Sequence, residues 1–177
     1  LSLLLMIFPL GLKQKPTVMI PTLTEGQQAT LTCTAPGLCS GSNLTTFRQR
    51  HSSTLTFNPS AEHHNTNVTC KIHFTGETTT EKTSGLNVNY KGKPQIIGNK
   101  TVKEGDDLNL TCSIESFPPA LTVWKKLGSY VNLHNDTGSA TLVIYNVTTE
   151  HSGQYICAAK YLNTTVTSEV NVTVTCK

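Results

Sequence analysis

The chain has 177 residues and a net charge of +3, and charged side chains make up only 14% of it. This length fits one ordinary domain or two small ones. The basic residues are spread along the chain and form no cluster interleaved with aromatic residues, which excludes a nucleic-acid partner. Thr contributes 29 residues and Ser 13. Thr-rich, alternating sequence is typical of half-exposed strands.

The first twelve residues contain the most apolar run of the chain, residues 1–10, which is shorter than the ~18 apolar residues of a membrane span. No other stretch reaches that length, so we expect no membrane span in this chain. The run has the length of a signal-peptide core, but it has no basic segment before it and no clean cleavage site after it. The alternative is translated non-coding sequence, because pyrimidine-rich codons encode Leu, Ser, Phe and Pro. On either interpretation, residues 1–12 are expected to lie outside the fold.

A repeat with a spacing of 79 residues divides the remaining chain into two similar halves. In each half a Glu-Gly pair precedes a Leu-Thr-Cys strand segment, and a second cysteine follows later. The pattern comprises Glu25-Gly26, Leu31-Thr32-Cys33 and Cys70, then Glu104-Gly105, Leu110-Thr111-Cys112 and Cys157. A turn, a strand with alternate residues inward and a cysteine from the facing sheet are typical of an immunoglobulin-like β-sandwich. An internal repeat of this length indicates two copies of one domain.

We therefore predict an all-β chain of two tandem immunoglobulin-like sandwiches of constant or intermediate type. Their predicted bounds are residues 13–90 and 91–176. Each sandwich should be closed by one disulfide between its facing sheets. The predicted pairs are Cys33–Cys70 and Cys112–Cys157.

The first domain should begin near Pro16, with six strands at residues 17–20, 28–34, 44–49, 54–58, 67–74 and 78–89. Phe47 stands fourteen residues after the first cysteine, where such domains carry a core Trp. Val68 replaces the corner tyrosine that usually precedes the second cysteine by two positions. Both departures predict that the first domain unfolds before the second.

The second domain matches the immunoglobulin pattern more fully. Trp124, the only Trp, follows Cys112 by twelve residues and is expected to pack on the disulfide. Tyr155 stands two residues before Cys157, which is the position of the corner tyrosine. A last hairpin is expected near residues 161–165, followed by a final strand over 166–174.

Eight Asn-x-Ser/Thr triplets occur, whereas chance would give about three for this composition. Together with the disulfide pattern, this excess indicates a glycosylated extracellular protein. Those within strands alternate with inward positions and so should face water, and the others lie near turns or strand ends. The predicted N-glycosylation sites are Asn43, Asn67, Asn99, Asn109, Asn135, Asn146, Asn163 and Asn171.

Two segments of the first domain resemble the sialic-acid-binding immunoglobulin-type lectins, the Siglec family. The stretch Lys15–Pro21 resembles the family's entry into its second domain, and Leu31–Cys39 resembles the first cysteine strand there, including an extra cysteine six residues on. The resemblance covers about 160 residues and corresponds to the family's second and third domains. It implies a spacer that carries an N-terminal sugar-binding domain, which is absent from this chain.

The resemblance further implies that cell-surface glycoproteins or glycolipids are bound through that absent variable-type domain. No ligand-binding residue carries over, and Arg48 and Arg50 are interpreted as solvated strand residues. Cys39 would bridge to the absent domain, with a free thiol or a bond to Cys176 as alternatives. Cys176 stands where a linker to a further domain would begin. The implied location is extracellular, with a parent protein that crosses the plasma membrane once.

No catalytic or metal-binding pattern emerges from the sequence, and no cofactor is expected. His63 and His64 are adjacent in a turn and fit no zinc-ligand spacing. No nucleophile elbow is present, and the paired cysteines are consumed in disulfides, so an enzyme is not expected. The alternatives to the lectin spacer are a protein-binding immune or neural receptor ectodomain and a secreted immunoglobulin-domain module.

Overall fold

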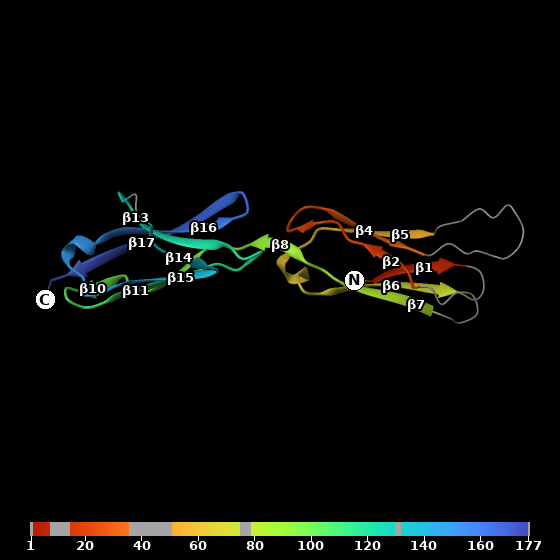
Figure 1. The fold of residues 1–177 in the computed structure, drawn as a ribbon, viewed down its shortest axis with the longest axis horizontal. Coiled ribbons are helices and arrows are strands. Elements are labelled where there is room, and N and C mark those ends of the chain that lie inside the picture. The colour runs from red at the N-terminus through yellow and green to blue at the C-terminus, as the bar shows by residue number, and fades with distance from the viewer. Residues whose placement is uncertain (1, 8–14, 36–50, 75–78, 130–131, 177) are drawn as a thin grey trace, which may run out of the picture. The chain divides into compact units, whose positions relative to one another are not determined.

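The computed structural model describes residues 2–7, 15–35, 51–74, 79–129 and 132–176 (Figure 1). Within this part nearly all regular structure is β-strand, as predicted. Internal contacts divide the chain into a first domain, residues 1–89, and a second domain, residues 90–177. This division falls one residue before the boundary expected from the sequence. Cys39, Asn43 and Phe47 lie outside the described residues.

The first domain contains two three-stranded sheets, β2-β4-β5 and β1-β6-β7, and a short parallel pair of β3 with β8. Its strands alternate between buried and exposed side chains, which is what two facing sheets require. The strands are β1 (Ser2–Ile7), β2 (Thr17–Met19), β3 (Leu23–Thr24), β4 (Ala29–Thr34), β5 (Ser52–Phe57), β6 (Asn67–Phe74), β7 (Thr79–Gly85) and β8 (Val88–Lys91).

The two repeated cysteine strands have the same alternation of burial. In β4, Leu31 and Cys33 are fully buried, and in β11 (Leu108–Ser113) Leu110 and Cys112 are fully buried in the same way. Before each strand a glycine takes a positive φ, +75° at Gly26 and +91° at Gly105, which an L side chain rarely adopts. The repeat therefore encodes a turn and the strand that follows it.

The N-terminal segment corrects the expectation that residues 1–12 lie outside the fold. The backbone of β1 pairs in parallel with β6, and the register places Leu3 opposite Cys70 (Figure 1). In the second domain the corresponding neighbour of the cysteine strand is the Trp strand, where Trp124 lies opposite Cys157. A short apolar run can complete a sheet as well as be cut from a precursor, and composition alone does not distinguish the two.

The second domain is a two-layer sandwich with a five-stranded sheet, β10-β17-β16-β13-β14, and a three-stranded sheet, β15-β11-β9. Its first strand is split, because β9 pairs with β11 in one sheet and β10 pairs in parallel with β17 in the other. The elements not yet named are β9 (Gln95–Gly98), β10 (Thr101–Lys103), β12 (Ser116–Phe117), β13 (Leu121–Lys126), β14 (Asn132–Thr137), β15 (Ser139–Ile144), β16 (Gly153–Tyr161) and β17 (Thr164–Thr175).

One buried polar group in the second domain has no partner among the described residues. The Thr122 side chain is fully buried, and its hydroxyl makes no hydrogen bond. It lies on β13 directly opposite Ala159 of β16, beside the small apolar cluster of Ile114, Ala120 and Tyr161. A buried hydroxyl without a partner costs about 1–3 kcal/mol in desolvation.

Replacing this hydroxyl by a methyl group should stabilise the second domain. We expect Thr122→Val to raise the free energy of unfolding by about 1 kcal/mol, because the shape is kept and the desolvation cost is removed. Urea unfolding followed by the fluorescence of Trp124 measures this directly. Thr141→Val is the matched control, since the Thr141 hydroxyl lies at the surface, 3.0 Å from that of Thr111. A gain in the control equal to that of Thr122→Val would contradict the assignment.

Candidate functional site

The two predicted disulfides join the facing sheets of each domain. Cys33 of β4 is bonded to Cys70 of β6, with their Cα atoms 6.1 Å apart. Cys112 of β11 is bonded to Cys157 of β16, with a Cα separation of 6.3 Å. All four residues are fully buried. Their sulfurs are therefore structural and unavailable for nucleophilic or metal chemistry.

Trp124 takes the core position that its spacing from Cys112 predicted. Its side chain is fully buried in the cluster that contains Cys112 and Cys157. The indole Nε1–H donates a hydrogen bond to the Ala140 carbonyl at 2.9 Å. This bond links the two sheets, because Trp124 lies on β13 and Ala140 on β15.

Tyr155 forms the tyrosine corner that was expected from its place before Cys157. Its hydroxyl donates to the His151 carbonyl at 2.8 Å, and burial raises the pKa of the phenol. The Lys126 ammonium lies 5.8 Å from the ring centroid. In the first domain the equivalent Val68 is fully buried but offers no hydroxyl for this bond.

A second repeated feature was missed in the sequence. Both domains have a 3-10 turn before the second cysteine strand, η1 (Ala61–His63) and η2 (Thr149–His151), and each ends in a histidine that reaches back to a hydroxyl residue. The Ser60 N–H donates to Nδ1 of His63 at 3.1 Å, and the Thr148 N–H donates to Nδ1 of His151 at 3.0 Å. Ser/Thr-x-Glu-His in both halves was the available signal.

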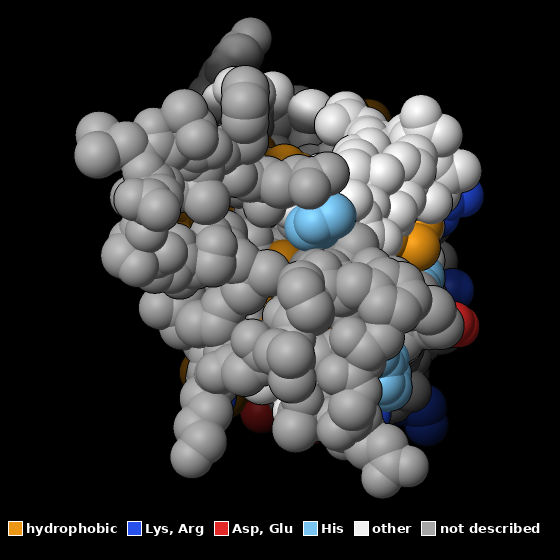
Figure 2. Space-filling view, turned by 90° about the vertical axis from the view of Figure 1, so that its right-hand side faces the viewer, with side chains coloured by type: hydrophobic (Ala, Val, Ile, Leu, Met, Phe, Trp, Pro, Cys, Tyr) orange, Lys and Arg blue, Asp and Glu red, His pale blue; other side chains and the backbone are white. Residues whose placement is uncertain are grey.

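These contacts give His63 and His64 structural partners. The Val88 N–H donates to Nδ1 of His64 at 3.2 Å, and the ring of His63 packs edge-on against Phe57. Among the described residues, no group of three His, Cys, Asp or Glu could hold a metal ion. Figure 2 looks onto the end of the first domain, and the histidine side chains visible there lie apart from one another.

The seven predicted glycosylation sites within the described residues all have exposed side chains. Asn67, Asn109, Asn135 and Asn171 lie on strands, and the remaining sites lie in or beside turns. Asn146 has a φ of +50°, a region that Asn tolerates better than other residues with a side chain. Attachment of a glycan at each site stays a prediction.

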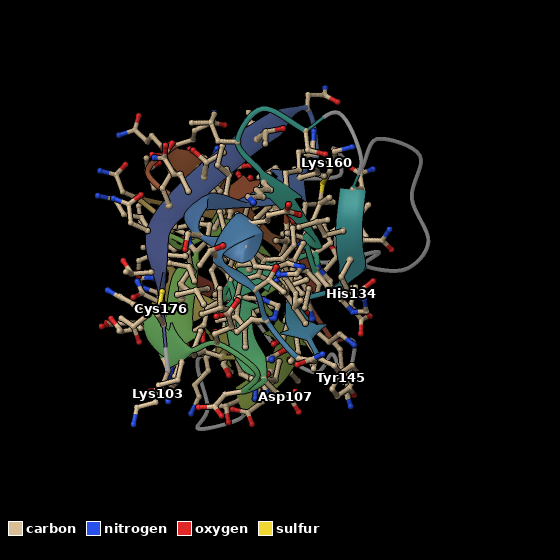
Figure 3. All side chains as sticks on the ribbon, turned by 90° about the vertical axis from the view of Figure 1, so that its left-hand side faces the viewer. Lys103, Asp107, His134, Tyr145, Lys160 and Cys176 are labelled. Carbon is tan, nitrogen blue, oxygen red and sulfur yellow. A yellow bond between two sulfur atoms is a disulfide. The ribbon has the colours of Figure 1, made fainter. Side chains whose placement is uncertain are left out.

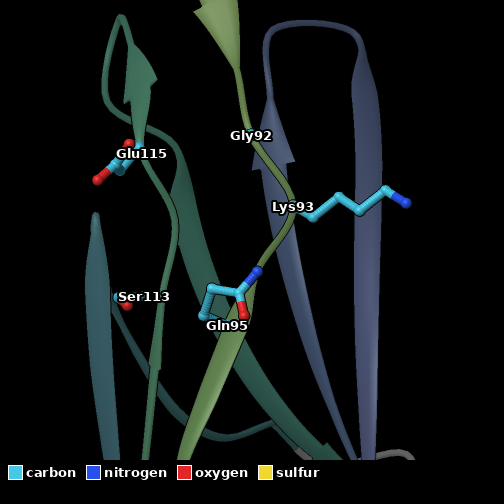
Figure 4. A pocket seen from close by; sticks show the side chains of 5 residues that line it. All are labelled: Gly92, Lys93, Gln95, Ser113 and Glu115. Atoms are coloured by element: carbon cyan, nitrogen blue, oxygen red, sulfur yellow. The ribbon is translucent and has the colours of Figure 1, made fainter.

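A pocket of about 320 Å³ in the second domain is lined by Gly92, Lys93, Gln95, Ser113 and Glu115 (Figure 4). The Lys93 and Glu115 side chains extend in opposite directions, away from the space between them. Part of its wall is backbone, where the Gly92 N–H donates to the Glu115 carbonyl at 2.8 Å. A ligand site needs polar groups that converge on one point, and these do not.

A pocket in the first domain, about 410 Å³, lies beside β3 and likewise lacks charged side chains in its lining, which comprises Ile20, Pro21, Thr22, Leu23, Gly85, Asn87 and Asn89. No helix in the described part of the chain is long and apolar enough to cross a membrane. Cys176 is exposed and is the free cysteine of the described residues.

Comparison with known proteins places these observations in a family context. The family model of the immunoglobulin domain matches residues 93–160. The chain is 29% identical to human sialic acid-binding Ig-like lectin 6, over 86% of this chain and 40% of that protein. It is 32% identical to human sialic acid-binding Ig-like lectin 16, over 85% of this chain and 35% of that protein.

Among solved structures, the full ectodomain of mouse nectin-like molecule 4 superposes with a TM-score of 0.69. It covers 91% of this chain and 64% of that chain at 19% identity, a similarity that shows the fold alone. The relatives named above are lectins, and neither name is that of an enzyme.

The fold, the two inter-sheet disulfides and the family match define the chain as an extracellular immunoglobulin-type receptor ectodomain region. More particularly, its two tandem immunoglobulin domains are Siglec-like, as the resemblance in the sequence predicted. The chain spans about a quarter to two fifths of the length of the curated relatives named here and their close counterparts, 26–40%.

Proposed function

We propose that this chain is the glycosylated spacer of a Siglec-like cell-surface receptor. In this proposal it holds a sialic-acid-binding domain away from the membrane, and the parent protein crosses the plasma membrane once. The observation that carries the proposal is the similarity to sialic acid-binding lectins over both domains, 85–86% of the chain. The glycan ligand would then be a sialylated glycoprotein or glycolipid on a cell surface.

The described surface supports a spacer because it offers no constructed site for a sugar carboxylate. Recognition of a carboxylate usually depends on an arginine that makes a charge-assisted, two-point contact. Both arginines of the chain, Arg48 and Arg50, lie outside the described residues. The lysine of the one pocket with opposite charges, Lys93, points away from the remaining lining residues (Figure 4).

The proposal is tested with residues 1–177 secreted from mammalian cells and applied to a glycan array. We expect no binding that sialidase treatment removes. In a second arm, the chain replaces the corresponding two domains of human sialic acid-binding Ig-like lectin 6 on cells. The chimera should retain sialic-acid-dependent adhesion, whereas deletion of the two domains should reduce adhesion to large opposing cells.

The opposite result would place the lectin site in this chain. Sialic-acid-dependent binding by residues 1–177 alone, abolished by Arg48→Ala or Arg50→Ala, would contradict the spacer. Failure of the chimera to support adhesion, with normal folding and surface display, would also count against it. In the chimera Cys39 is expected to form a disulfide with the preceding domain.

A specific observation favours the second candidate, a receptor that binds protein through a sheet face. The second domain exposes three large apolar side chains on one sheet: Ile97 on β9, Val143 on β15 and Tyr145 just after β15. Neighbouring exposed apolar side chains are typical of interaction surfaces. What covers these residues decides between the two candidates.

A further inference from the structure

The outer face of the three-stranded sheet in the second domain has an apolar centre within a polar surround. Ile97, Val143 and Tyr145 are 70%, 38% and 74% exposed, respectively. We call these three side chains the apolar strip. The other outward residues of this sheet are polar: Gln95, Asn109, Thr111, Ser113, Ser139 and Thr141.

Asn109 lies in the middle of the apolar strip. It is on the central strand β11, directly opposite Val143 of β15. The register also pairs Thr111 with Ile97, which makes Ile97 a diagonal neighbour of Asn109 on the other side. Tyr145 is the diagonal neighbour two positions beyond Val143. Diagonal neighbours lie about 7–8 Å apart, within the reach of one bulky substituent on Asn109.

The opposite face of the domain also carries acceptor triplets. Asn135 of β14 lies opposite Val123 of β13, and Asn171 of β17 lies opposite Gln154 of β16, all on the outer face of the five-stranded sheet. Figure 3 shows Tyr145 and Lys160, which mark the two outer faces, on opposite sides of the domain. Each outer face therefore has at least one exposed acceptor Asn.

We propose that Asn109 is an occupied N-glycosylation site whose oligosaccharide covers the apolar strip. The occupant is encoded in the chain itself, because Asn109-Leu110-Thr111 is an acceptor triplet at the centre of the strip. An N-linked glycan is bulky and solubilising. Its innermost sugars pass over Val143 and its neighbours, which removes exposed apolar surface that would otherwise favour association.

The modification balances as a transfer from a lipid-pyrophosphate-linked oligosaccharide. The Nδ2 nitrogen of Asn109 forms a bond to C1 of the first sugar and loses one proton. The bond between C1 and the pyrophosphate oxygen breaks, and the lipid pyrophosphate leaves. No oxidant or reductant is needed. The reaction requires only that the chain pass through a secretory compartment, which is the single element shared with the proposed function.

Occupancy at Asn109, with Asn135 and Asn171 on the other face, removes both sheet faces of the second domain as protein-docking surfaces. The apolar strip is then a glycan-contact surface, and its exposure ceases to support the protein-binding candidate. Protein contacts with this domain are confined to its strand edges and end loops. This consequence deepens the spacer proposal, on which the transfer reaction itself does not depend.

The test uses residues 1–177 secreted from mammalian cells. Glycopeptides are mapped after enzymatic release in heavy-oxygen water, which labels each formerly glycosylated Asn. Asn109 should be labelled in most molecules. Binding of a hydrophobic fluorescent dye should rise about two-fold when the wild-type glycans are removed enzymatically, and by a similar factor in Asn109→Gln.

Asn171→Gln is the matched control, because it removes a strand acceptor whose opposite neighbour is the polar Gln154. It should leave dye binding unchanged. Adding Tyr145→Thr to Asn109→Gln should return dye binding towards the wild-type value, which assigns the signal to the apolar strip. If Asn109→Gln is not secreted, the wild-type glycopeptide map and enzymatic release still decide the question.

The outcomes separate this inference from the proposed function. An unmodified Asn109 in a secreted chain whose other triplets are glycosylated overturns the inference and leaves the spacer standing. A modified Asn109 with no change in dye binding on release overturns the covering role. A chain that is not secreted and carries no glycan anywhere overturns the extracellular function as well.

Discussion

Trp124→Ala should lower the free energy of unfolding of the second domain by about 3–5 kcal/mol. The indole is fully buried against the Cys112–Cys157 disulfide, so truncation leaves a cavity in the centre of the core. Truncation also leaves the Ala140 carbonyl without its indole partner. Because the substitution removes the only Trp, unfolding is followed by hydrogen exchange at β16 in increasing urea.

Two further variants make this test selective. Trp124→Phe keeps an aromatic ring but no N–H, and should cost less than the alanine variant. Tyr145→Ala removes a side chain that is 74% exposed, and should change stability by less than about 0.5 kcal/mol. A loss below about 1 kcal/mol for Trp124→Ala would show that the indole does not support the core.

Removal of residues 1–12 should destabilise the first domain by about 3–6 kcal/mol. The deletion takes away β1, whose six residues pair with β6 from Thr69 to Phe74. The estimate assumes about five interstrand hydrogen bonds at roughly 0.5–1.5 kcal/mol each. Hydrogen exchange should accelerate along β6 and remain unchanged along β16, which serves as the internal control.

The first domain offers a direct alternative outcome. If exchange along β6 is as slow in the deletion variant as in the full chain, β1 is dispensable, and the original expectation that residues 1–12 lie outside the fold is restored. If the first domain unfolds completely, exchange in β4 and β6 rises together while the second domain keeps its protection. The two results are distinguishable within one experiment.

The architecture was predictable because the sandwich depends on a few residues at fixed spacing. Cys33, Cys70, Cys112 and Cys157 define which strands face each other, and the twelve-residue spacing to Trp124 places the core indole. Tyr155 was predictable for the same reason, since its role depends only on its distance from Cys157. Local spacing carries this information without any knowledge of the partner sheet.

The features that were missed depend on contacts remote in sequence or on a weak local signal. The place of β1 follows from pairing with β6, and an apolar run does not name its partner strand. The histidines His63 and His151 were legible only by comparing the two halves, because a single Ser/Thr-x-Glu-His segment is common. The apolar strip around Asn109 required the register of three strands, and periodicity alone does not supply it.

The pairing of β1 with β6 also has a consequence for biosynthesis. Ser2 lies opposite Thr69, so this apolar strand is made 67 residues before its partner. At about 5–20 residues per second, the ribosome needs several seconds to complete that interval. During this time the nascent β1 has no strand to pair with, and contacts of such long sequence separation form late in folding. The first domain is therefore expected to depend on chaperones during synthesis more than the second, in which β16 and β17 are joined by a short turn.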